Sequence, residues 1–367
     1  MSGDRAAIEA YFRAIGQTTR IGREAAPDGP CLEVDACRVG WFRARATHLH
    51  TRLPAGSHAA AAHGGLQDSV PRSGLLGLHT RLAEVGPASW EDPSLAQVWL
   101  RRADYVVPRA DVGVFTLGAM PRDPAQAAAL DALAEVAVRA CAGRPRPTRE
   151  VSRAVAGMAP PQWLRLVGPT GRILLRWDAS RIDAVPAGRP AVDPERARHE
   201  LARRFLRWHG PASERQFAKW AGVPRTDAAQ TWQALRPELV PVSLAGRARW
   251  LLAVDEPALR GATAPGGVRL LPIGDPYLQL DVPMLTEAAP TGAAAASLAD
   301  RTDDRRLLNS LTGRILLDGQ LVGAWGRRGT QVTLALWDTG GATERIDAEA
   351  ARLAGPLGAT PSIRWLT

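Results

Sequence analysis

The chain has 367 residues and a mass of 39.3 kDa, which predicts two or three domains and excludes a small disulfide-stapled module. Hydrophobic residues make up 46% and charged residues 23%, a composition that excludes a largely disordered protein. The formal net charge is +9, from 46 Lys and Arg against 37 Asp and Glu, and this excess predicts a polyanionic partner, with nucleic acid ahead of anionic metabolites or a membrane surface.

The first residues of the chain carry no secretion signal, because they lack a basic segment followed by an apolar one. No stretch approaches the roughly 20 apolar residues that cross a membrane. The cysteines Cys31, Cys37 and Cys141 are odd in number and lack the spacing of zinc ligands. We therefore expect a cytoplasmic protein in a reducing compartment, with no membrane partner.

A first block of elements is predicted over residues 36–118. It contains helices over 36–53, 71–86 and 94–102, and then a hairpin around Pro108–Asp111. The first of these helices is basic, since arginines separate its apolar positions. Helices followed by a hairpin are the outline of a winged helix.

The same order recurs in two further blocks of about 60–80 residues each. In the block 119–190, helices are predicted over 123–141, from Thr148 and over 159–167, with a hairpin of 171–178 and 182–187. In the block 191–255, helices are predicted over 193–210, 213–222 and 226–235, with a hairpin of 238–244 and 247–254. The blocks share a pattern and not a sequence, and they indicate a repeat architecture.

The remainder, 256–367, has more strand signals than the blocks before it. Apolar runs at 268–274, 313–329 and 330–340 alternate around Gly and Asp-Gly turns, and a helix is predicted near 345–357. Two short alanine-rich stretches are predicted as a helix segment, Ala59–Ala62, and a mobile loop, Gly292–Ala296. The whole chain is predicted to be α+β and mostly helical.

Three segments resemble the AlkZ/YcaQ family of winged-helix DNA glycosylases: 204–235, 270–278 with its DPY element, and 314–329 with its DGxxVGxW element. The resemblance implies three tandem winged-helix domains and a β-rich C-terminal part that form a C-shaped DNA-binding cleft. The implied domains are 36–118, 119–190, 191–255 and 256–367, preceded by an extension, 1–35, that resembles nothing known to us. Family enzymes hydrolyse the N-glycosidic bond of alkylated purines, including bulky antibiotic adducts and interstrand crosslinks, and the resemblance favours a monomer without a cofactor.

The family's catalytic signature is a Gln-Φ-Gln or Gln-Φ-Asp triplet, in which Φ is apolar, just ahead of a helix in the first winged helix. Here Gln67 and Asp68 are the polar pair before the predicted helix, and the first triplet position becomes Gly65 or Leu66. Gln67 could hold the reacting water, while an ionised Asp68 could stabilise a cationic sugar and accept a proton from the water. The alternative is that Asp68 caps the helix and Gln67 faces solvent.

A second departure from the family pattern lies in residues 101–108, where family members often have Arg-x-Thr-x-His-x-Val-Pro. Ala103 stands at the Thr position and Tyr105 at the His position. Together the two departures predict a branch with its own substrate, or one that binds DNA without cutting.

DNA contacts are predicted at basic residues near this site and at a predicted hairpin tip. The alternative for each of them is a solvated surface charge. They are Arg72, Arg81, Arg101, Arg102, Arg109, Arg327 and Arg328. Tyr105 could pack in the hairpin or stack on a displaced sugar or base. The close histidines His48, His50, His58 and His63 lack Cys or carboxylate partners at ligand spacing, so no metal is expected.

Two functions remain from sequence. The first is a monofunctional DNA glycosylase for N7- or N3-alkylated purines in double-stranded DNA, in repair or in self-resistance to a genotoxin. The second is a non-catalytic winged-helix protein that recognises damaged DNA or regulates transcription.

Overall fold

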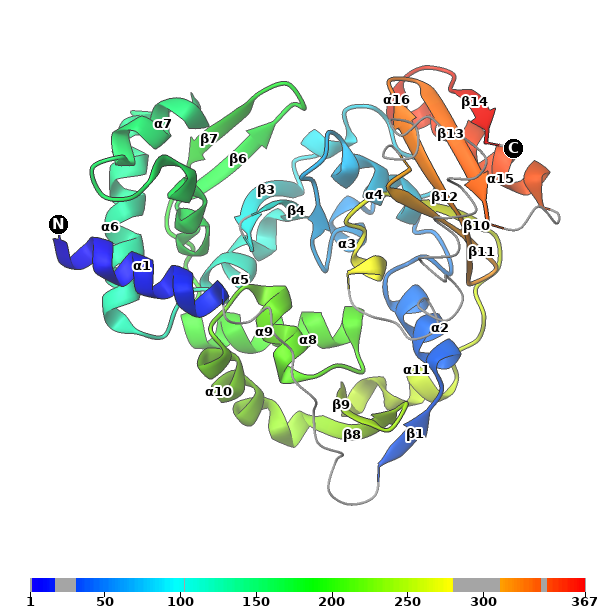
Figure 1. The fold of residues 1–367 in the computed structure, drawn as a ribbon, viewed down its shortest axis with the longest axis horizontal. Coiled ribbons are helices and arrows are strands. Elements are labelled where there is room, and N and C mark those ends of the chain that lie inside the picture. Colours follow the sequence, from blue (N-terminus) through cyan, green and yellow to red (C-terminus); the bar gives the residue numbers. More distant parts are fainter. Residues whose placement is uncertain (1, 17–30, 102, 280–310, 338–341, 367) are drawn as a thin grey trace.

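The computed structural model describes residues 2–16, 31–101, 103–279, 311–337 and 342–366, and these residues form helices and three β-sheets (Figure 1). The fold is a mixed α+β fold, as the sequence predicted. The predicted loop Gly292–Ala296 lies outside the described residues.

The largest sheet has six strands in the order β2-β4-β3-β6-β7-β5. These strands are β2 (Leu66–Gln67), β3 (Leu95–Leu100), β4 (Ala103–Pro108), β5 (Arg146–Pro147), β6 (Ile173–Trp177) and β7 (Ile182–Pro186). The hairpins β3–β4 and β6–β7 come from the first and second predicted blocks, and they join through one residue pair, Gln97 with Leu175. The sheet therefore continues across the predicted domain boundary.

Two predictions in the first block were wrong. The segment 94–102 forms β3 and not a helix, because it pairs with β4 on one side and β6 on the other, and all of its strand residues are buried. An apolar run that is buried on both faces has no periodicity from which to tell strand from helix. The run after Pro108 forms the helix α5 (Val112–Leu117) and not the second strand of a hairpin, since its Phe115 packs in a helical core cluster with Leu201 and Phe205.

Most of the other predicted helices are present, but two are shorter than predicted: the helix predicted over 36–53 ends at Ala46, and the one predicted over 71–86 spans only Ser73–Arg81, because Leu53 and Leu82 pair in an isolated β-bridge. They are α2 (Ala36–Ala46), α3 (His58–Ala61), α4 (Ser73–Arg81), α6 (Pro124–Cys141), α7 (Thr148–Val155), α8 (Pro194–His209), α9 (Glu214–Ala221) and α10 (Arg225–Leu235). Local chemistry explains their starts: the carboxylates of Asp123 and Asp193 accept backbone N–H bonds at the first turns of α6 and α8, each followed by proline. The segment 159–167 instead forms the 3₁₀ helix η4 (Pro161–Thr170), which contains prolines at its start and at Pro169.

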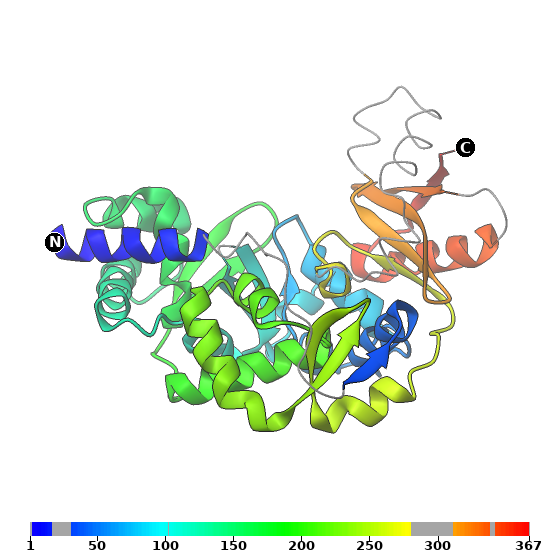
Figure 2. The same ribbon diagram turned by 60° about the horizontal axis from the view of Figure 1, so that its bottom comes forward.

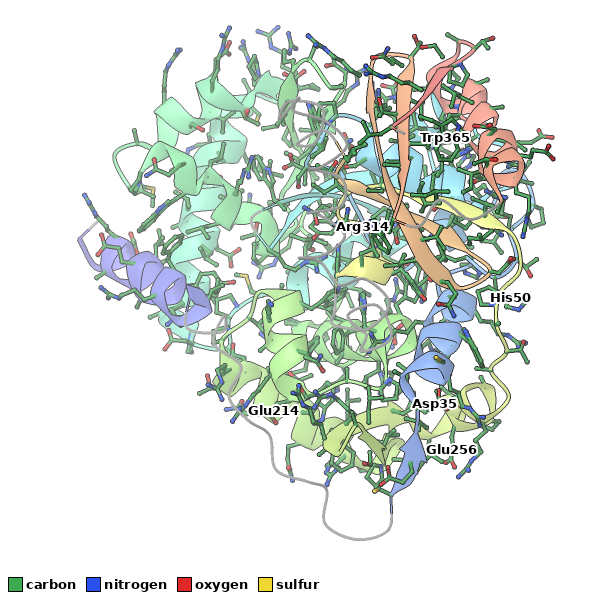
Figure 3. The ribbon with its side chains drawn as sticks, turned by 45° about the vertical axis from the view of Figure 1, so that its right-hand side comes forward. Asp35, His50, Glu214, Glu256, Arg314 and Trp365 are labelled. Carbon is green, nitrogen blue, oxygen red and sulfur yellow. The ribbon has the colours of Figure 1, made fainter. Side chains whose placement is uncertain are left out.

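Two described parts of the predicted extension 1–35, residues 2–16 and 31–35, pack against the rest of the fold. The helix α1 (Ser2–Gly16) packs on α6 through the buried Ile8 and Tyr11. The strand β1 (Leu32–Val34) adds in parallel to the hairpin of β8 (Leu239–Leu244) and β9 (Arg247–Leu252). In Figure 3, Asp35 lies between β1 and α2, where its side chain accepts a hydrogen bond from the Arg38 N–H.

The C-terminal part forms a five-stranded sheet of β10 (Val268–Leu271), β11 (Gly313–Leu317), β12 (Gln320–Arg328), β13 (Gln331–Leu336) and β14 (Ser362–Trp365). It is preceded by the short helix α11 (Glu256–Arg260), and the helices α15 (Thr343–Ala351) and α16 (Ala354–Leu357) accompany it. Figure 2 shows this sheet beside the blue and cyan elements of the first block. Leu76 of α4 is buried in the core of this sheet, so α4 connects the first block to the C-terminal part.

Among the described residues, no helix is long and apolar enough to cross a membrane. Cys31, Cys37 and Cys141 are free thiols.

Candidate functional site

The predicted catalytic pair lies at the end of the edge strand β2, where Gln67 is the last strand residue and Asp68 directly follows it, in the segment that leads to α4. Leu66 pairs with Val106 and Gln67 with Tyr105, and the Asp68 N–H continues the pairing to the Asp104 carbonyl at 2.7 Å. Successive side chains of a strand point to opposite faces. Gln67 and Asp68 therefore belong to different environments.

Asp68 is a buried residue, with 2% of its surface exposed. One carboxylate oxygen accepts the Gly74 N–H at 2.8 Å in the first turn of α4, and the other accepts the Gln97 side-chain amide at 3.0 Å. Burial raises the pKa of Asp68 to about 7, although both hydrogen bonds and the nearby Arg72 oppose the shift. The sequence left open that Asp68 contacts the start of the following helix, and the hydrogen bond from the Gly74 N–H shows that contact.

Asp68 should titrate near neutrality. Its pKa is about 7 in the folded chain against an ordinary value of 3.8, so between these values the folded state holds a proton that the unfolded state has lost. The contribution of this group to stability is therefore highest at low pH and falls as pH rises from about 4 to about 7. The ¹³C shift of the Asp68 carboxyl should show a midpoint near 7. The Asp318 carboxyl, whose pKa is lowered by Arg345, is the internal control, and a midpoint for Asp68 below 5 would contradict the prediction.

Gln67 does not simply face solvent. Its side-chain Nε2 donates to the Ser69 Oγ at 3.2 Å, and its Oε1 accepts the Tyr105 hydroxyl at 3.2 Å. The Gln279 amide also reaches this oxygen at 3.5 Å. Gly274 lies so close that a Cβ there would come within 2.8 Å of the Gln67 oxygen. The Gln67 amide is thus oriented by three polar side chains and a glycine contact.

Two of the arginines predicted to contact DNA, Arg81 and Arg72, make contacts within the protein instead. Arg81 is fully buried and forms a two-pronged ion pair with the equally buried Asp275, at 2.8 and 2.9 Å. Since it cannot reach a phosphate, the prediction for Arg81 was wrong. Arg72 has a left-handed backbone, with φ 68°, and its guanidinium donates to the Asp178 carbonyl at 2.8 Å and stacks on Trp90 at 4.1 Å. These contacts occupy Arg72 at the start of α4.

Arg101 and Tyr105 lie together next to Gln67. The Arg101 guanidinium stacks over the Tyr105 ring at 4.1 Å and over the Trp220 ring at 4.7 Å, and it donates to the Gln279 oxygen at 3.2 Å. Tyr105 is 3% exposed, so its side chain packs in the hairpin, which is the first of the two alternatives that the sequence left open. Its hydroxyl is nevertheless used to orient Gln67.

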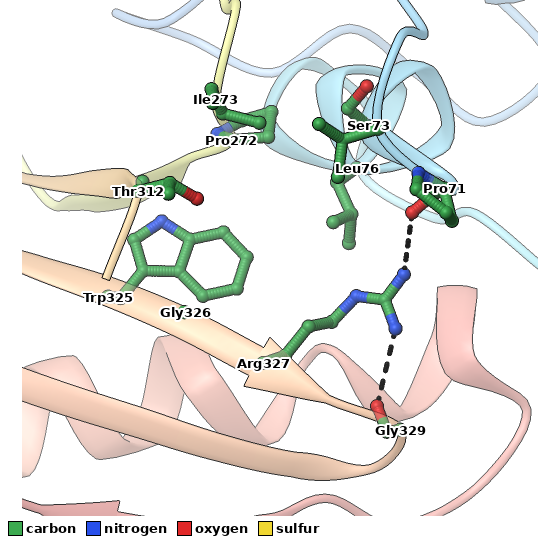
Figure 4. Close-up of a pocket in the computed structure, with 12 residues that line it drawn as sticks. Pro71, Ser73, Leu76, Pro272, Ile273, Thr312, Trp325, Gly326, Arg327 and Gly329 are labelled. Carbon is green, nitrogen blue, oxygen red and sulfur yellow. Dashed lines mark hydrogen bonds between the residues drawn. The ribbon is translucent and has the colours of Figure 1, made fainter. Parts of the chain in front are cut away.

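The remaining predicted contacts differ in accessibility. Arg109 and Arg328 are exposed, and Arg109 also donates to the Pro93 carbonyl at 2.9 Å. Arg327, at the end of β12, donates to the Pro71 carbonyl at 2.9 Å and to the Gly329 carbonyl at 3.3 Å (Figure 4). Arg102 lies outside the described residues.

Three residues that sequence reasoning missed complete the site. Gln97 links Asp68 to β6, because its oxygen accepts the Trp177 N–H while its amide donates to Asp68. Ser69 and Gln279 contact Gln67 directly. A polar residue at i+2 from Gln67 was a signal for Ser69, whereas Gln97 and Gln279 become neighbours of the site only in the folded chain.

In the described part of the chain, no group of three or more potential ligands could hold a metal ion. His58, one of the clustered histidines, contacts the Asp92 carboxylate at 3.0 Å, and His63 lies against Trp208.

Comparisons with known proteins give one family and one fold. The model of a family described as "DNA glycosylase AlkZ-like" matches residues 60–355. Among solved structures, the Streptomyces sahachiroi DNA glycosylase AlkZ superposes with a TM-score of 0.70 at 18% identity, covering 91% of this chain and 100% of that one. At this identity the likeness shows the fold alone. No curated protein matches the sequence.

Proposed function

Because this chain belongs to the AlkZ-like DNA glycosylase family and is a DNA glycosylase, we propose that its substrate is a purine alkylated at N7 or N3 in duplex DNA. Such a base carries positive charge and leaves readily, so the protein has to bind the duplex, place one water molecule and favour a cationic sugar. The residues around Gln67 supply groups for the last two tasks.

The observation that carries the proposal is the contact between Gln67 and Ser69. The family signature has polar residues at positions i and i+2, and here the side chains at these two positions contact each other, with Gln67 at the end of β2 and Ser69 in the bend that follows it. Gln67 and Ser69 meet that requirement, with Asp68 in the middle position where the signature is apolar. We therefore assign Gln67 and Ser69 to the reacting water, with the Gln67 amide held in one orientation by Tyr105.

Asp68 takes a different part in this scheme. Its carboxylate is buried behind β2 and fixes the first turn of α4 through Gly74. When ionised, it places a negative charge in a low-dielectric region next to the reaction site, which favours an oxocarbenium-like sugar. Asp68 is thus a positioning residue with an electrostatic contribution. The bond between the purine nitrogen and C1′ breaks with its electron pair going to the cationic base, which leaves as a neutral purine. The water oxygen forms the new bond to C1′, and the proton that this water loses passes to solvent.

The DNA-binding architecture is part of the same proposal. The hairpins β3–β4, β6–β7 and β8–β9 each accompany helices of one block, which supports three tandem winged helices around a C-shaped cleft. Arg109, Arg327 and Arg328 are the proposed phosphate contacts, together with Arg102. We place the reaction in the cytoplasm and assign it to a monomer, in repair or self-resistance, with crosslinks among the candidate lesions.

The experiment is release of free base from a duplex that carries a single N7-methylguanine, with spontaneous loss subtracted. Release above background, together with binding that weakens as salt rises, is the expected result. Tight, salt-dependent binding without any release would favour the non-catalytic DNA-binding protein, for which the altered triplet is the motivating observation.

A further inference from the structure

The Gln67 side-chain amide can point in two directions, which differ only in the exchange of its oxygen and its nitrogen. In the structure its Oε1 accepts the Tyr105 hydroxyl at 3.2 Å, and its Nε2 donates to the Ser69 Oγ at 3.2 Å. A hydroxyl can donate or accept a hydrogen bond, so neither of these contacts excludes the opposite direction. The choice between the two directions therefore depends on a neighbour whose own role is fixed.

Gln279 is that neighbour, because groups with a single role hold both ends of its amide. Its Oε1 accepts an N–H of the Arg101 guanidinium at 3.2 Å, and a guanidinium can only donate. Its Nε2 donates to the Gly274 carbonyl at 2.8 Å, and a carbonyl can only accept. The opposite direction of the Gln279 amide would place two donors together at one end and two acceptors at the other. The direction of this amide is therefore fixed.

The hairpin β3–β4 and the core hold Arg101 in place. Arg101 lies in the turn between these two strands, with a left-handed backbone of φ 51°. Its guanidinium stacks on the rings of Tyr105 and Trp220, and both rings belong to one buried cluster. The donor that orients Gln279 thus has contacts of its own on both sides.

The fixed direction of Gln279 determines the direction of Gln67. The Gln279 Nε2 lies 3.5 Å from the Gln67 Oε1, which is a long hydrogen bond. If the Gln67 amide were reversed, two N–H groups would face each other at this position. The contact acts mainly by excluding that arrangement. The Gln67 oxygen therefore faces Gln279 and Tyr105, and its N–H faces Ser69.

We infer that Gln279 is a positioning residue for the reaction, which acts by directing the Gln67 N–H toward Ser69 and the reacting water. The inference rests on the proposed function, because it takes Gln67 and Ser69 to hold that water. In this direction Gln67 can donate to the water oxygen, and Ser69 keeps a lone pair that can accept a water O–H. One donor and one acceptor leave one water lone pair for C1′, which restricts the water to the orientation for attack.

The first test is a double-mutant cycle between Gln279 and Gln67. Gln279→Glu keeps an acceptor for Arg101 but has no N–H, so the Gln67 amide should reverse and direct its oxygen toward Ser69. We expect single-turnover release of N7-methylguanine to slow about tenfold, while duplex affinity stays within about threefold. In the Gln67→Ala background the same change should have no further effect, because Gln279 acts only through Gln67.

Two comparisons separate this effect from charge and from damage to the fold. Gln233→Glu, at an exposed glutamine of α10, adds the same negative charge and should leave release unchanged. A negative charge near the sugar would by itself favour the cationic transition state, so slower release in Gln279→Glu is opposite to a direct charge effect. Unchanged release in Gln279→Glu, or an equal loss in the wild-type and Gln67→Ala backgrounds, would overturn the inference.

The direction of the amide can also be measured without activity. Nuclear Overhauser effects from the Gln67 amide protons should be stronger to the Ser69 β protons than to the ring of Tyr105, one of three tyrosines in the chain. In Gln279→Glu this order should reverse. Stronger contacts to Tyr105 in the wild-type chain, or an order unchanged in the variant, would overturn the inference. A wild-type chain that shows the expected contacts but releases no base would count against the proposed function and not against the direction that Gln279 sets.

Discussion

Replacing Gln67 with alanine is expected to lower the rate of base release by about 10²-fold or more, while duplex affinity stays within about threefold. The amide is held between Ser69 and Tyr105, and it packs against Gly274, so its position before the substrate arrives is already set. Preorganised groups of this kind act mainly in the transition state, and their loss lowers kcat more than it raises KM. The measurement is single-turnover release of N7-methylguanine.

A graded series of substitutions separates this role from a structural one. Ser69→Ala should lower the rate of base release about tenfold, because Gln67, the other side chain proposed to hold the water, remains. Gln162→Ala is the matched control, since Gln162 is an exposed glutamine on η4, and it should have no effect. If Gln67→Ala retained wild-type release within threefold, Gln67 would not contact the reacting water, and the reaction would have to be placed elsewhere.

Breaking the pair between Arg81 and Asp275 is expected to lower the free energy of unfolding by about 3–5 kcal/mol. Both side chains are 0% exposed, so the partner that remains after Arg81→Met or Asp275→Leu is a buried charge without its counter-charge. Asp275 also accepts the Tyr277 N–H at 3.0 Å, and Arg81 bonds to the Gly77 carbonyl. Urea unfolding of each variant measures the effect.

The double variant is the internal control for this pair. Arg81→Met combined with Asp275→Leu leaves no unpaired charge, so it should cost less than the sum of the single variants. Asp318→Asn, which breaks an exposed pair with Arg345, should change stability very little. Additive costs for Arg81 and Asp275 would show that the ion pair is not the source of the loss.

Local signals in the sequence predicted much of the fold. Asp-Pro pairs mark the starts of α6 and α8 because the carboxylate and the proline act within one turn. Glycine and Asp-Gly turns likewise separate the C-terminal strands. Local signals could not predict pairing between strands that are far apart in the sequence. The strand β1 pairs with β8, and β3 pairs with β6 of the second block.

The candidate site was also predicted only in part from the sequence. Gln67 and Asp68 could be identified because they are a polar pair before a predicted helix. The sequence did not show that Asp68 is buried while Gln67 contacts Ser69 and Tyr105, because these contacts depend on the folded chain. Arg81 looked like a surface charge because its partner, Asp275, lies 194 residues along the chain. The DPY element that carried part of the family resemblance contains this partner, so at least its aspartate serves the core.

The joint between β3 and β6 has a mechanical consequence. The backbones of the two hairpins pair at one residue, and the Gln97 side chain and the buried Trp99 ring add further contacts from β3 to the second block. In Figure 1 the β6–β7 hairpin lies above and to the left of the β3–β4 hairpin. Gln97 belongs to this joint, and its side chain accepts the Trp177 N–H while its amide donates to Asp68. The carboxylate behind Gln67 is therefore tied through one side chain to the second block, so a displacement of β6 is transmitted to Asp68.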